Sequence, residues 1–386
     1  MLLTAIGALS LVVWLYLVLA RGGFWLARER DDRGAPAAPA AWPAVTAVVP
    51  ARNEADVIAA AMTGLLGQDY PGAFHVILVD DQSSDGTAAA ALGVARAQGA
   101  EDRLQVIDGK PLPKGWTGKL WALAQGVEQA STAVPPPAYV LLTDADIGHA
   151  PGNLRTLAAR AEAGQLALAA QMVRLHCATT AEKLLIPAFV FFFQMLFPFA
   201  WVNDPHRRTA AGAGGCMLVR REALEAAGGI ASVRTEIIDD CALAARLKRQ
   251  GPIWLGLTER AESLRPYPTI GEIGRMISRS AYAQLGYSPW RLAGTVAGMG
   301  LTYLAPPVLA LAGHGAAQWT GAAAWLLMAI SFQPTLRLYR RSPLWGLALP
   351  LIGALYTGFT IQSAIQVWQG RGGQWKGRSQ AIVGPA

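Results

Sequence analysis

Two aspartates follow an apolar segment in the middle of the chain. The segment reads Y-V-L-L-T-D-A-D and places Asp144 and Asp146 two positions apart after a β-prone stretch. On an extended backbone such residues project to the same side. Hard divalent cations such as Mg²⁺ or Mn²⁺ take oxygen ligands and keep sites open for substrate phosphates. The pair predicts a metal-nucleotide site at the carboxyl end of a strand. The competing interpretation is a turn in which an aspartate caps the next helix.

Further acidic pairs stand at the borders of other expected elements. H-V-I-L-V-D-D, which ends at Asp80 and Asp81, indicates a second strand, and S-S-D-G-T then opens a helix by Ser/Asp capping. Asp239 and Asp240, in T-E-I-I-D-D-C-A-L, stand at or near the start of another helix. A carboxylate there is ordinarily a cap. Two adjacent carboxylates after an apolar pair can instead place one in a cleft as a general base.

Two glycine-containing loops lie between these elements. D-G-K-P-L-P-K-G-W-T-G-K-L-W forms a shaped loop that brings Lys114 and Lys119 to the start of a helix. Helix N-termini favour anions, so a lysine there adds charge to a phosphate site, although a lysine in a loop is often only solvated. A-G-A-G-G-C-M-L-V-R-R contains Gly214 and Gly215, which permit close approach to a ligand or to another strand.

The order of the expected elements indicates the fold class. Apolar strands are expected near residues 45–49, 75–81, 104–107, 139–144 and 166–175, and helices lie between them. Strands that alternate with helices indicate an α/β fold with a mostly parallel, covered, Rossmann-like sheet. In such sheets ligands bind outside the carboxyl ends of the strands. The acidic residues at these strand ends are therefore expected to meet at one edge.

The composition indicates a membrane protein with a soluble part. Of the 386 residues, 53% are hydrophobic and 15% are charged, whereas a soluble domain has roughly 25% charged residues. Residues 1–20 carry no charge and suffice to cross a bilayer, and basic residues follow from Arg21 onward. Because a basic region does not precede this segment, we interpret it as an uncleaved anchor with its downstream side in the cytoplasm.

The rest of the chain divides by composition. Residues 21–43 predict an Ala- and Pro-rich linker, and residues 44–290 the cytoplasmic α/β domain. Within that domain the apolar segment 184–202 is expected to lie in the membrane interface, because a single crossing would separate the acids on either side of it. A buried core helix is the alternative. Residues 291–368 predict transmembrane or re-entrant helices, and residues 369–386 a basic tail. Their topology stays open, because three full crossings would place that tail outside.

Charge and cysteine content exclude some classes of protein. The net charge is +7, but the basic residues cluster beside apolar segments, where anionic lipid headgroups are the nearer partner. We find no nucleic-acid-binding motif and expect no nucleic-acid partner. The three cysteines show neither metal-ligand spacing nor a disulfide framework, which fits a reduced, cytosolic setting.

Six motifs, in order, resemble those of the family 2 glycosyltransferases, which have a GT-A fold. They are V-V-P-A-R-N-E, V-D-D-Q-S-S-D-G-T, G-W-T-G-K, T-D-A-D, G-G-C-M-L-V-R-R-E-A-L and I-I-D-D-C-A-L-A-A-R-L-K. The resemblance covers about residues 44–290. The segments L-Y-L-V-L-A-R-G-G-F-W and S-R-S-A-Y-A-Q-L-G-Y-S further resemble the bacterial hopene-associated glycosyltransferases, a membrane branch tied to hopanoid lipids.

This resemblance implies roles for particular residues. Asp80 or Asp81 would accept hydrogen bonds from the uracil of a UDP-sugar, and Asp85 would hold the following turn or reach the ribose. Asp240 would be the catalytic base, with Asp239 left open as the alternative. The implied donor-binding residues are Pro50, Ala51, Glu54, Asp80, Asp81, Asp85, Lys119 and Asp144; the implied metal ligands are Asp144 and Asp146; the implied acceptor region contains Gly214, Gly215, Arg279 and Gln284.

The implied activity is inverting, metal-dependent transfer of one sugar from a UDP-sugar to a membrane lipid, with a hopanoid as the expected acceptor. The Q-x-x-R-W motif of processive synthases is absent, which argues against polymer synthesis. The expected location is the bacterial inner membrane, with several spans and the catalytic domain facing the cytoplasm. Transfer to a polyprenyl phosphate is an alternative, for which Arg207 and Arg208 would supply positive charge. A non-catalytic scaffold would have lost the acids, and a transporter would need charged residues in its apolar spans.

Overall fold

The computed structural model describes residues 1–34, 36–372, 374–375 and 378–379. The chain divides into two compact units. The sheet unit comprises Glu29–His176, Trp201–Arg265 and Gln374–Ala386, and the helical unit comprises Met1–Arg28, Cys177–Ala200 and Pro266–Gly373. The basic tail predicted at 369–386 lies largely outside the described residues.

The described part of the sheet unit is built on one sheet of eight strands, in the order β3-β2-β1-β4-β7-β6-β8-β5. Strands β3, β2, β1 and β4 are parallel, as are β6 and β8, whereas β7 is antiparallel to both of its neighbours and β5 is antiparallel to β8. The strands are β1 (Val45–Ala51), β2 (Phe74–Asp80), β3 (Leu104–Asp108), β4 (Tyr139–Thr143), β5 (Ile147–His149), β6 (Leu168–Arg174), β7 (Cys216–Arg220) and β8 (Ile253–Ser263). The predicted mostly parallel α/β sheet is confirmed.

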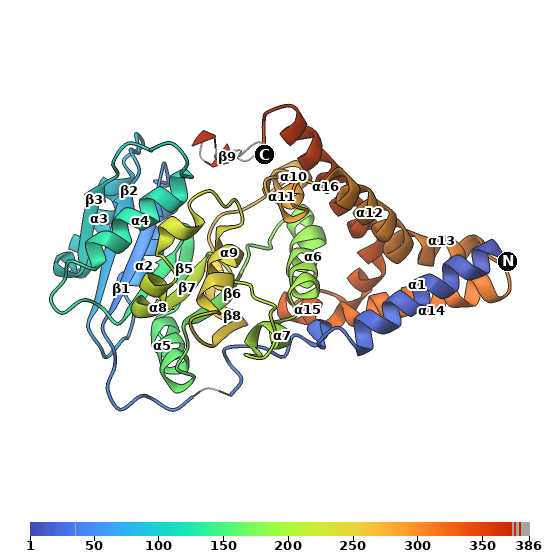
Figure 1. Cartoon of the computed structure of the whole chain (residues 1–386), viewed down its shortest axis with the longest axis horizontal. Helices are drawn as coiled ribbons and strands as arrows, with labels where there is room; N and C mark the ends of the chain where they lie inside the picture. The colour runs from blue at the N-terminus through green and yellow to red at the C-terminus, as the bar shows by residue number, and fades with distance from the viewer. Residues whose placement is uncertain (35, 373, 376–377, 380–386) are drawn as a thin grey trace. The chain divides into compact units, whose positions relative to one another are not determined.

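Helices cover the sheet and connect its strands. In Figure 1, α3 and α4 lie beside β1, β2 and β3. The packing of α4 is very close, because a Cβ on Gly126 would lie 2.3 Å from Cγ1 of Val48. The helices of this unit are α2 (Ile58–Leu66), α3 (Thr87–Gln98), α4 (Gly118–Ala130), α5 (Asn153–Ala163), α8 (Arg221–Ala226) and α9 (Asp239–Leu247), with short 3-10 turns at Glu101–Arg103 and Ile230–Val233. A further short helix, α7 (Phe199–Asn203), contains the boundary between the two units.

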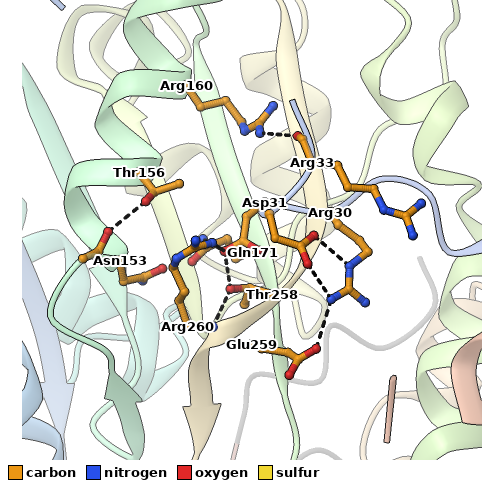
Figure 2. Close-up of polar contacts among 12 residues, drawn as sticks. Arg30, Asp31, Arg33, Asn153, Thr156, Arg160, Gln171, Thr258, Glu259 and Arg260 are labelled. Carbon is orange, nitrogen blue, oxygen red and sulfur yellow. Dashed lines mark hydrogen bonds and ion pairs between the residues drawn. The ribbon is translucent and has the colours of Figure 1, made fainter. Parts of the chain in front are cut away.

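The segment that follows the first apolar helix packs onto the sheet. The Asp31 N–H donates to the carbonyl of Leu257 at 3.0 Å, and the Leu257 N–H donates to the carbonyl of Glu29 at 2.9 Å. Figure 2 shows the Asp31 carboxylate among side chains from β6 and β8. Residues 29–31 of the predicted linker at 21–43 therefore form part of the sheet's packing.

The helical unit contains the long apolar segments. Among its described residues, three helices are long and apolar enough to cross a membrane: Leu2–Leu19, Pro289–Ala312 and Pro343–Trp368. Within the unit, α1 lies along α14 (Figure 1). Its helices are α1 (Leu2–Leu19), α6 (Thr180–Leu196), α10 (Ile270–Ser278), α11 (Ala281–Gln284), α12 (Pro289–Met299), a π-helical turn (Gly300–Leu304), α13 (Ala305–Ala312), α14 (Ala316–Ser331), α15 (Gln333–Leu338) and α16 (Leu349–Trp368), with 3-10 turns at Phe24–Leu26 and Pro343–Ala348.

The apolar segment predicted at 184–202 is divided at Pro198, whereas Pro187 lies inside a helix. Helix α6 ends at Leu196, and α7 begins at Phe199, directly after Pro198. Helix α6 begins with a capping box between Thr179 and Glu182, and it packs against α15 and α16 within the helical unit. The interfacial position of this segment stays a prediction, as do the domain boundaries given above.

Candidate active site

The two aspartates of the T-D-A-D motif lie in a turn. Strand β4 ends at Thr143, and the Ile147 N–H donates to the carbonyl of Asp144 at 3.3 Å, which closes the turn into β5. The expected extended geometry of this pair is therefore wrong, because the chain changes direction to pair β5 with β8. The two carboxylates form ion pairs with different basic residues. Asp144 lies 2.7 Å from Nζ of Lys119, and Asp146 lies 3.2 Å from Nε of Arg265.

Lys119 joins carboxylates from two separate elements. It lies in the first turn of α4, and its Nζ is 2.7 Å from Oδ1 of Asp144 and 3.6 Å from Oδ2 of Asp239. Burial lowers the pKa of Lys119, but these carboxylates more than reverse that effect, so its pKa lies above the ordinary value. Lys119 is therefore a fixed positive charge between β4 and α9.

Asp240 is held by the backbone at the start of α9. Its Oδ2 accepts a hydrogen bond from the Gly214 N–H at 3.0 Å, and its Oδ1 accepts one from the Cys241 N–H at 2.7 Å. Burial, and then the charge of Asp239, raise the pKa of Asp240 to about 6. A carboxylate with a pKa near neutrality is suited to accept a proton at physiological pH.

These charged groups line one small cavity of about 20 Å³. That volume is enough for about one water molecule. Its polar lining consists of Lys119, Asp144, Asp239 and Asp240, together with Thr143 and the backbone of Gly214. A Cβ on Gly214 would lie 3.2 Å from Nζ of Lys119, so a larger residue would narrow the space between Lys119 and Asp240.

Arg265 forms a second charged cluster that was not predicted from the sequence. Its guanidinium binds the carboxylate of Glu54 and lies 3.6 Å from Asp56 and 3.2 Å from Asp146. Glu54, predicted to line the nucleotide pocket, is thus an ion-pair partner. No local pattern in S-L-R-P-Y distinguishes this arginine, because its partners come from the turn after β4 and from the loop after β1.

The loops after β1 and β2 are joined by hydrogen bonds between motif residues. The Asn53 N–H donates to Oγ of Ser83 at 3.0 Å, and the Ser84 N–H donates to Oδ1 of Asn53 at 3.0 Å. Asp85 accepts from the Ala55 N–H at 2.9 Å and from the hydroxyl of Thr87 at 2.6 Å. The hydrogen bond from Thr87 lowers the pKa of Asp85. Asp85 therefore holds the turn, which is one of its two implied roles.

Thr87 provides a test of this loop arrangement. Its hydroxyl accepts from the Glu54 N–H at 2.9 Å and donates to Asp85, and the side chain is fully buried. Thr87→Val keeps the shape but leaves a buried N–H without its acceptor, so the free energy of unfolding should fall by about 1 to 3 kcal/mol. Denaturant unfolding of the detergent-solubilised protein measures this change. Thr63→Val, at an exposed position of α2, is the matched control and should change stability by no more than about 0.5 kcal/mol. Equal losses in the two variants would contradict the role of Thr87.

The other implied donor-binding residues lie at the carboxyl ends of β1 and β2. Pro50 and Ala51 are the last residues of β1, and the Asp81 N–H donates to the carbonyl of Ala51 at 2.8 Å. Oδ1 of Asp80 accepts from the Ser83 N–H at 2.9 Å. The loop after β3 lies against this strand end, since a Cβ on Gly109 would be 3.0 Å from Cα of Asp81. Base recognition by Asp80 or Asp81 stays a prediction.

The residues of the implied acceptor region do not all lie in one unit. Gly214 contacts Asp240, and the carbonyl of Gly215 accepts from the hydroxyl of Thr143 at 2.7 Å. Arg279, which caps the C-terminus of α10, and Gln284, the last residue of α11, belong to the helical unit. Their role in acceptor binding stays a prediction.

The donor chemistry of the turn fits a divalent cation bound together with a nucleotide. Asp144 and Asp146 offer carboxylate oxygens, which Mg²⁺ and Mn²⁺ prefer. Among the described residues, there is no group of three or more His, Cys, Asp or Glu side chains arranged to hold a metal ion. Mg²⁺ usually needs only one or two carboxylates when substrate phosphates and water complete its shell. A metal that bound here would exchange with Lys119 and Arg265 as the partner of these aspartates.

Comparison with known proteins identifies the domain. Residues 46–228 match the model of the family described as Glycosyl transferase family 2. Residues 46–228 form a family 2 glycosyltransferase domain. The predicted enzyme class, a glycosyltransferase, is therefore confirmed. No curated protein sequence matches the chain.

Solved structures of glycosyltransferases resemble this chain. The mannosyltransferase PcManGT from Pyrobaculum calidifontis, solved with GDP-Man and Mn²⁺, is 21% identical, has a TM-score of 0.56, and covers 95% of this chain and 99% of its own. Glucosyl-3-phosphoglycerate synthase from Mycobacterium tuberculosis, solved with Mg²⁺ and UDP, is 18% identical, has a TM-score of 0.42, and covers 63% of this chain and 79% of its own. The likeness to PcManGT confirms the predicted GT-A fold of this glycosyltransferase.

Proposed function

We propose that the protein is an inverting, metal-dependent glycosyltransferase that transfers one sugar from a UDP-sugar to a membrane lipid at the cytoplasmic face of a bacterial inner membrane. The observation that carries the proposal is the convergence of Lys119, Asp144, Asp239 and Asp240 on one cavity in a family 2 domain. The motifs shared with hopene-associated enzymes favour a hopanoid as the acceptor.

Asp240 acts as the base in this mechanism. Its carboxylate takes the proton of the acceptor hydroxyl while that oxygen attacks the anomeric carbon and the bond to the departing diphosphate breaks. The Gly214 and Cys241 N–H groups fix the orientation of the carboxylate. Lys119 contributes positive charge beside the donor phosphates. A divalent cation held by Asp144 and Asp146 would neutralise charge on the departing nucleotide.

The apolar helices support a lipid acceptor. Three helices in the described residues have the length and composition of membrane spans, which supports association of the enzyme with a membrane. An acceptor that is itself a membrane lipid then needs no release into water. The protein is expected to receive a hydrophobic alcohol whose hydroxyl lies at the membrane surface.

Two narrower alternatives have specific observations behind them. A GDP-sugar is the second candidate donor, because the PcManGT structure holds GDP-Man. A polyprenyl phosphate is the second candidate acceptor, for which Arg207 and Arg208 would supply positive charge. Arg207 stacks over Trp201 at 4.7 Å and pairs with Asp204 at 3.7 Å, so a phosphate would have to compete with these partners. This competition favours a neutral lipid acceptor.

Membranes that contain the full-length protein test the function. We expect that, with Mn²⁺ or Mg²⁺, one member of a panel of UDP- and GDP-sugars yields a lipid heavier by one sugar in the mass spectrum of the lipid extract. A chelator should stop its formation, and added divalent cation should restore it. A product formed only from a GDP-sugar would overturn the UDP assignment, and product only on added polyprenyl phosphate would overturn the neutral acceptor. Identical lipid profiles with and without the protein, for every donor and acceptor, would contradict the proposal as a whole.

A further inference from the structure

A run of buried polar side chains crosses the sheet unit beneath the active site. Each of them is at least nine-tenths buried, and each is hydrogen-bonded to the next. Burying a polar group costs free energy unless it finds such a partner. We call this run the buried polar chain; its members are Thr143, His149, Asn153, Cys216, Gln171 and Asp31.

At the active-site end, the buried polar chain joins two segments that carry proposed functional residues. Thr143 is the last residue of β4 and directly precedes Asp144. Its hydroxyl donates to the carbonyl of Gly215 at 2.7 Å. The preceding residue, Gly214, donates its N–H to Asp240 at 3.0 Å. One hydroxyl therefore links the turn of the metal-binding aspartates to the glycine pair that orients the base.

The number of protons fixes the direction of these hydrogen bonds. The Thr143 hydroxyl has one proton, which it gives to Gly215, so it accepts from Nε2 of His149 at 3.0 Å. Nδ1 of His149 then accepts from the amide of Asn153 at 3.0 Å. Burial lowers the pKa of His149 to about 4, so the ring is neutral at pH 7 and holds a single proton. Thr143, His149 and Asn153 therefore have one set of donor and acceptor roles that is consistent with all three hydrogen bonds.

The other end of the buried polar chain is Asp31, which lies in the segment that follows the first apolar helix. The Asn153 amide donates to Sγ of Cys216 at 3.7 Å, the Cys216 thiol donates to Oε1 of Gln171 at 3.3 Å, and Gln171 donates to Asp31 at 3.2 Å. Oδ2 of Asp31 also accepts from Thr258 at 2.6 Å and lies 3.1 Å from Arg260, as Figure 2 shows. A carboxylate with three donors ends the chain.

We propose that the buried polar chain positions the catalytic groups: Thr143, oriented by His149, binds the Gly215 carbonyl and so holds the turn of Asp144 in register with Gly214, whose N–H binds Asp240. The proposal rests on the proposed function for the roles of Asp144 and Asp240. An apolar residue at position 143 would fill the same space but would fix neither the Gly215 carbonyl nor the His149 ring. Buried hydrogen bonds of this kind favour one arrangement of the groups that they join, although Oδ1 of Asn153 has no hydrogen-bond partner among the described residues.

The test compares variants of the full-length protein in detergent. Thr143→Val removes the hydroxyl, Thr143→Ser restores it, and Thr46→Val is the matched control at a buried threonine of β1. We measure turnover, the KM for the donor, and hydrogen exchange of the peptide that spans residues 211–217. For Thr143→Val we expect turnover to fall about tenfold, the equivalent of one hydrogen bond, with the donor KM unchanged and faster exchange at 211–217. Thr143→Ser and Thr46→Val should keep wild-type values.

The hydrogen-exchange measurement separates this proposal from the proposed function. Unchanged exchange at 211–217 in Thr143→Val would overturn the positioning role, and so would equal losses of turnover in Thr143→Val and Thr46→Val. If the wild type transferred no sugar, the proposed function would fail. The difference in hydrogen exchange at 211–217 between Thr143→Val and the wild type would still test whether Thr143 positions this segment. If Thr143→Val does not fold, His149→Leu and His149→Gln replace it, because only glutamine can still donate to Thr143. Faster exchange at 211–217 in His149→Leu alone would then support the role.

Discussion

Replacing Asp240 with asparagine is expected to lower turnover by about 10² to 10⁴-fold, the usual contribution of a general base. The amide has the size of the carboxylate and can still accept one of the two N–H hydrogen bonds at the start of α9. It cannot take a proton from the acceptor hydroxyl. Binding of the nucleotide donor should stay near the wild-type value, because Asp144, Asp146 and Lys119 are unchanged. Steady-state kinetics and calorimetric titration with the nucleoside diphosphate measure the two quantities separately.

Asp239→Asn is the matched control for this prediction. Asp239 lies beside the same cavity, 3.6 Å from Nζ of Lys119, whereas Asp240 has the hydrogen bond from Gly214. We expect the asparagine at position 239 to cost less turnover than the one at position 240. The reverse order would transfer the role of base to Asp239, and wild-type turnover in both variants would exclude a base from this pair.

The pH dependence of kcat/KM provides a second test of the role of Asp240. A base acts in its ionised form, and the pKa of Asp240 is raised to about 6. The value of kcat/KM should therefore fall about tenfold for each pH unit below 6 and level off above that value. The residual activity of Asp240→Asn should lack this acidic limb. If Asp240→Asn showed the same fall of kcat/KM below pH 6, the titrating group would be a different residue.

Much of the fold could be predicted because several strands are short apolar runs followed by strong turn signals. Strands β1, β2 and β4 lie where they were expected, since each run ends in residues that favour a turn or a helix cap. Strands β5 and β8 were not expected. The three residues of β5 are too few to show a period, and its pairing with β8 joins segments more than a hundred residues apart, which local sequence cannot indicate.

The site could be predicted only in part, for a similar reason. Asp144, which follows β4, shares one cavity with Asp239 and Asp240 at the start of α9, whereas Asp80, Asp81 and Asp146 are not among the residues that line it. The expected extended pair at 144 and 146 was wrong because pairing of β5 with β8 turns the chain there. Arg265 could not be identified from the sequence, because its ion pairs are with carboxylates from the turn after β4 and from the loop after β1.

The two aspartates of the turn after β4 form ion pairs with different basic residues. Lys119 binds Asp144 and Arg265 binds Asp146, so each carboxylate has a positive partner from a different part of the sheet unit. The repulsion between the two carboxylates is offset without a metal ion. In the proposed mechanism, a divalent cation that arrives with the donor phosphates would take over one or both of these contacts. The affinity for the metal should therefore depend on the carboxylates and should compete with the lysine and the arginine.

Asp144→Asn should show this dependence most strongly. The amide keeps an oxygen but loses the negative charge that attracts both Lys119 and a divalent cation, so we expect turnover to fall by at least about 100-fold. Mn²⁺ should no longer strengthen the binding of nucleoside diphosphate in a calorimetric titration. Asp69→Asn, which removes an exposed aspartate 3.2 Å from Arg155, is the matched control and should bind as the wild type does. If Mn²⁺ strengthened nucleotide binding equally in both variants, the cation would not be held by Asp144, and the turn after β4 would serve only to orient Lys119.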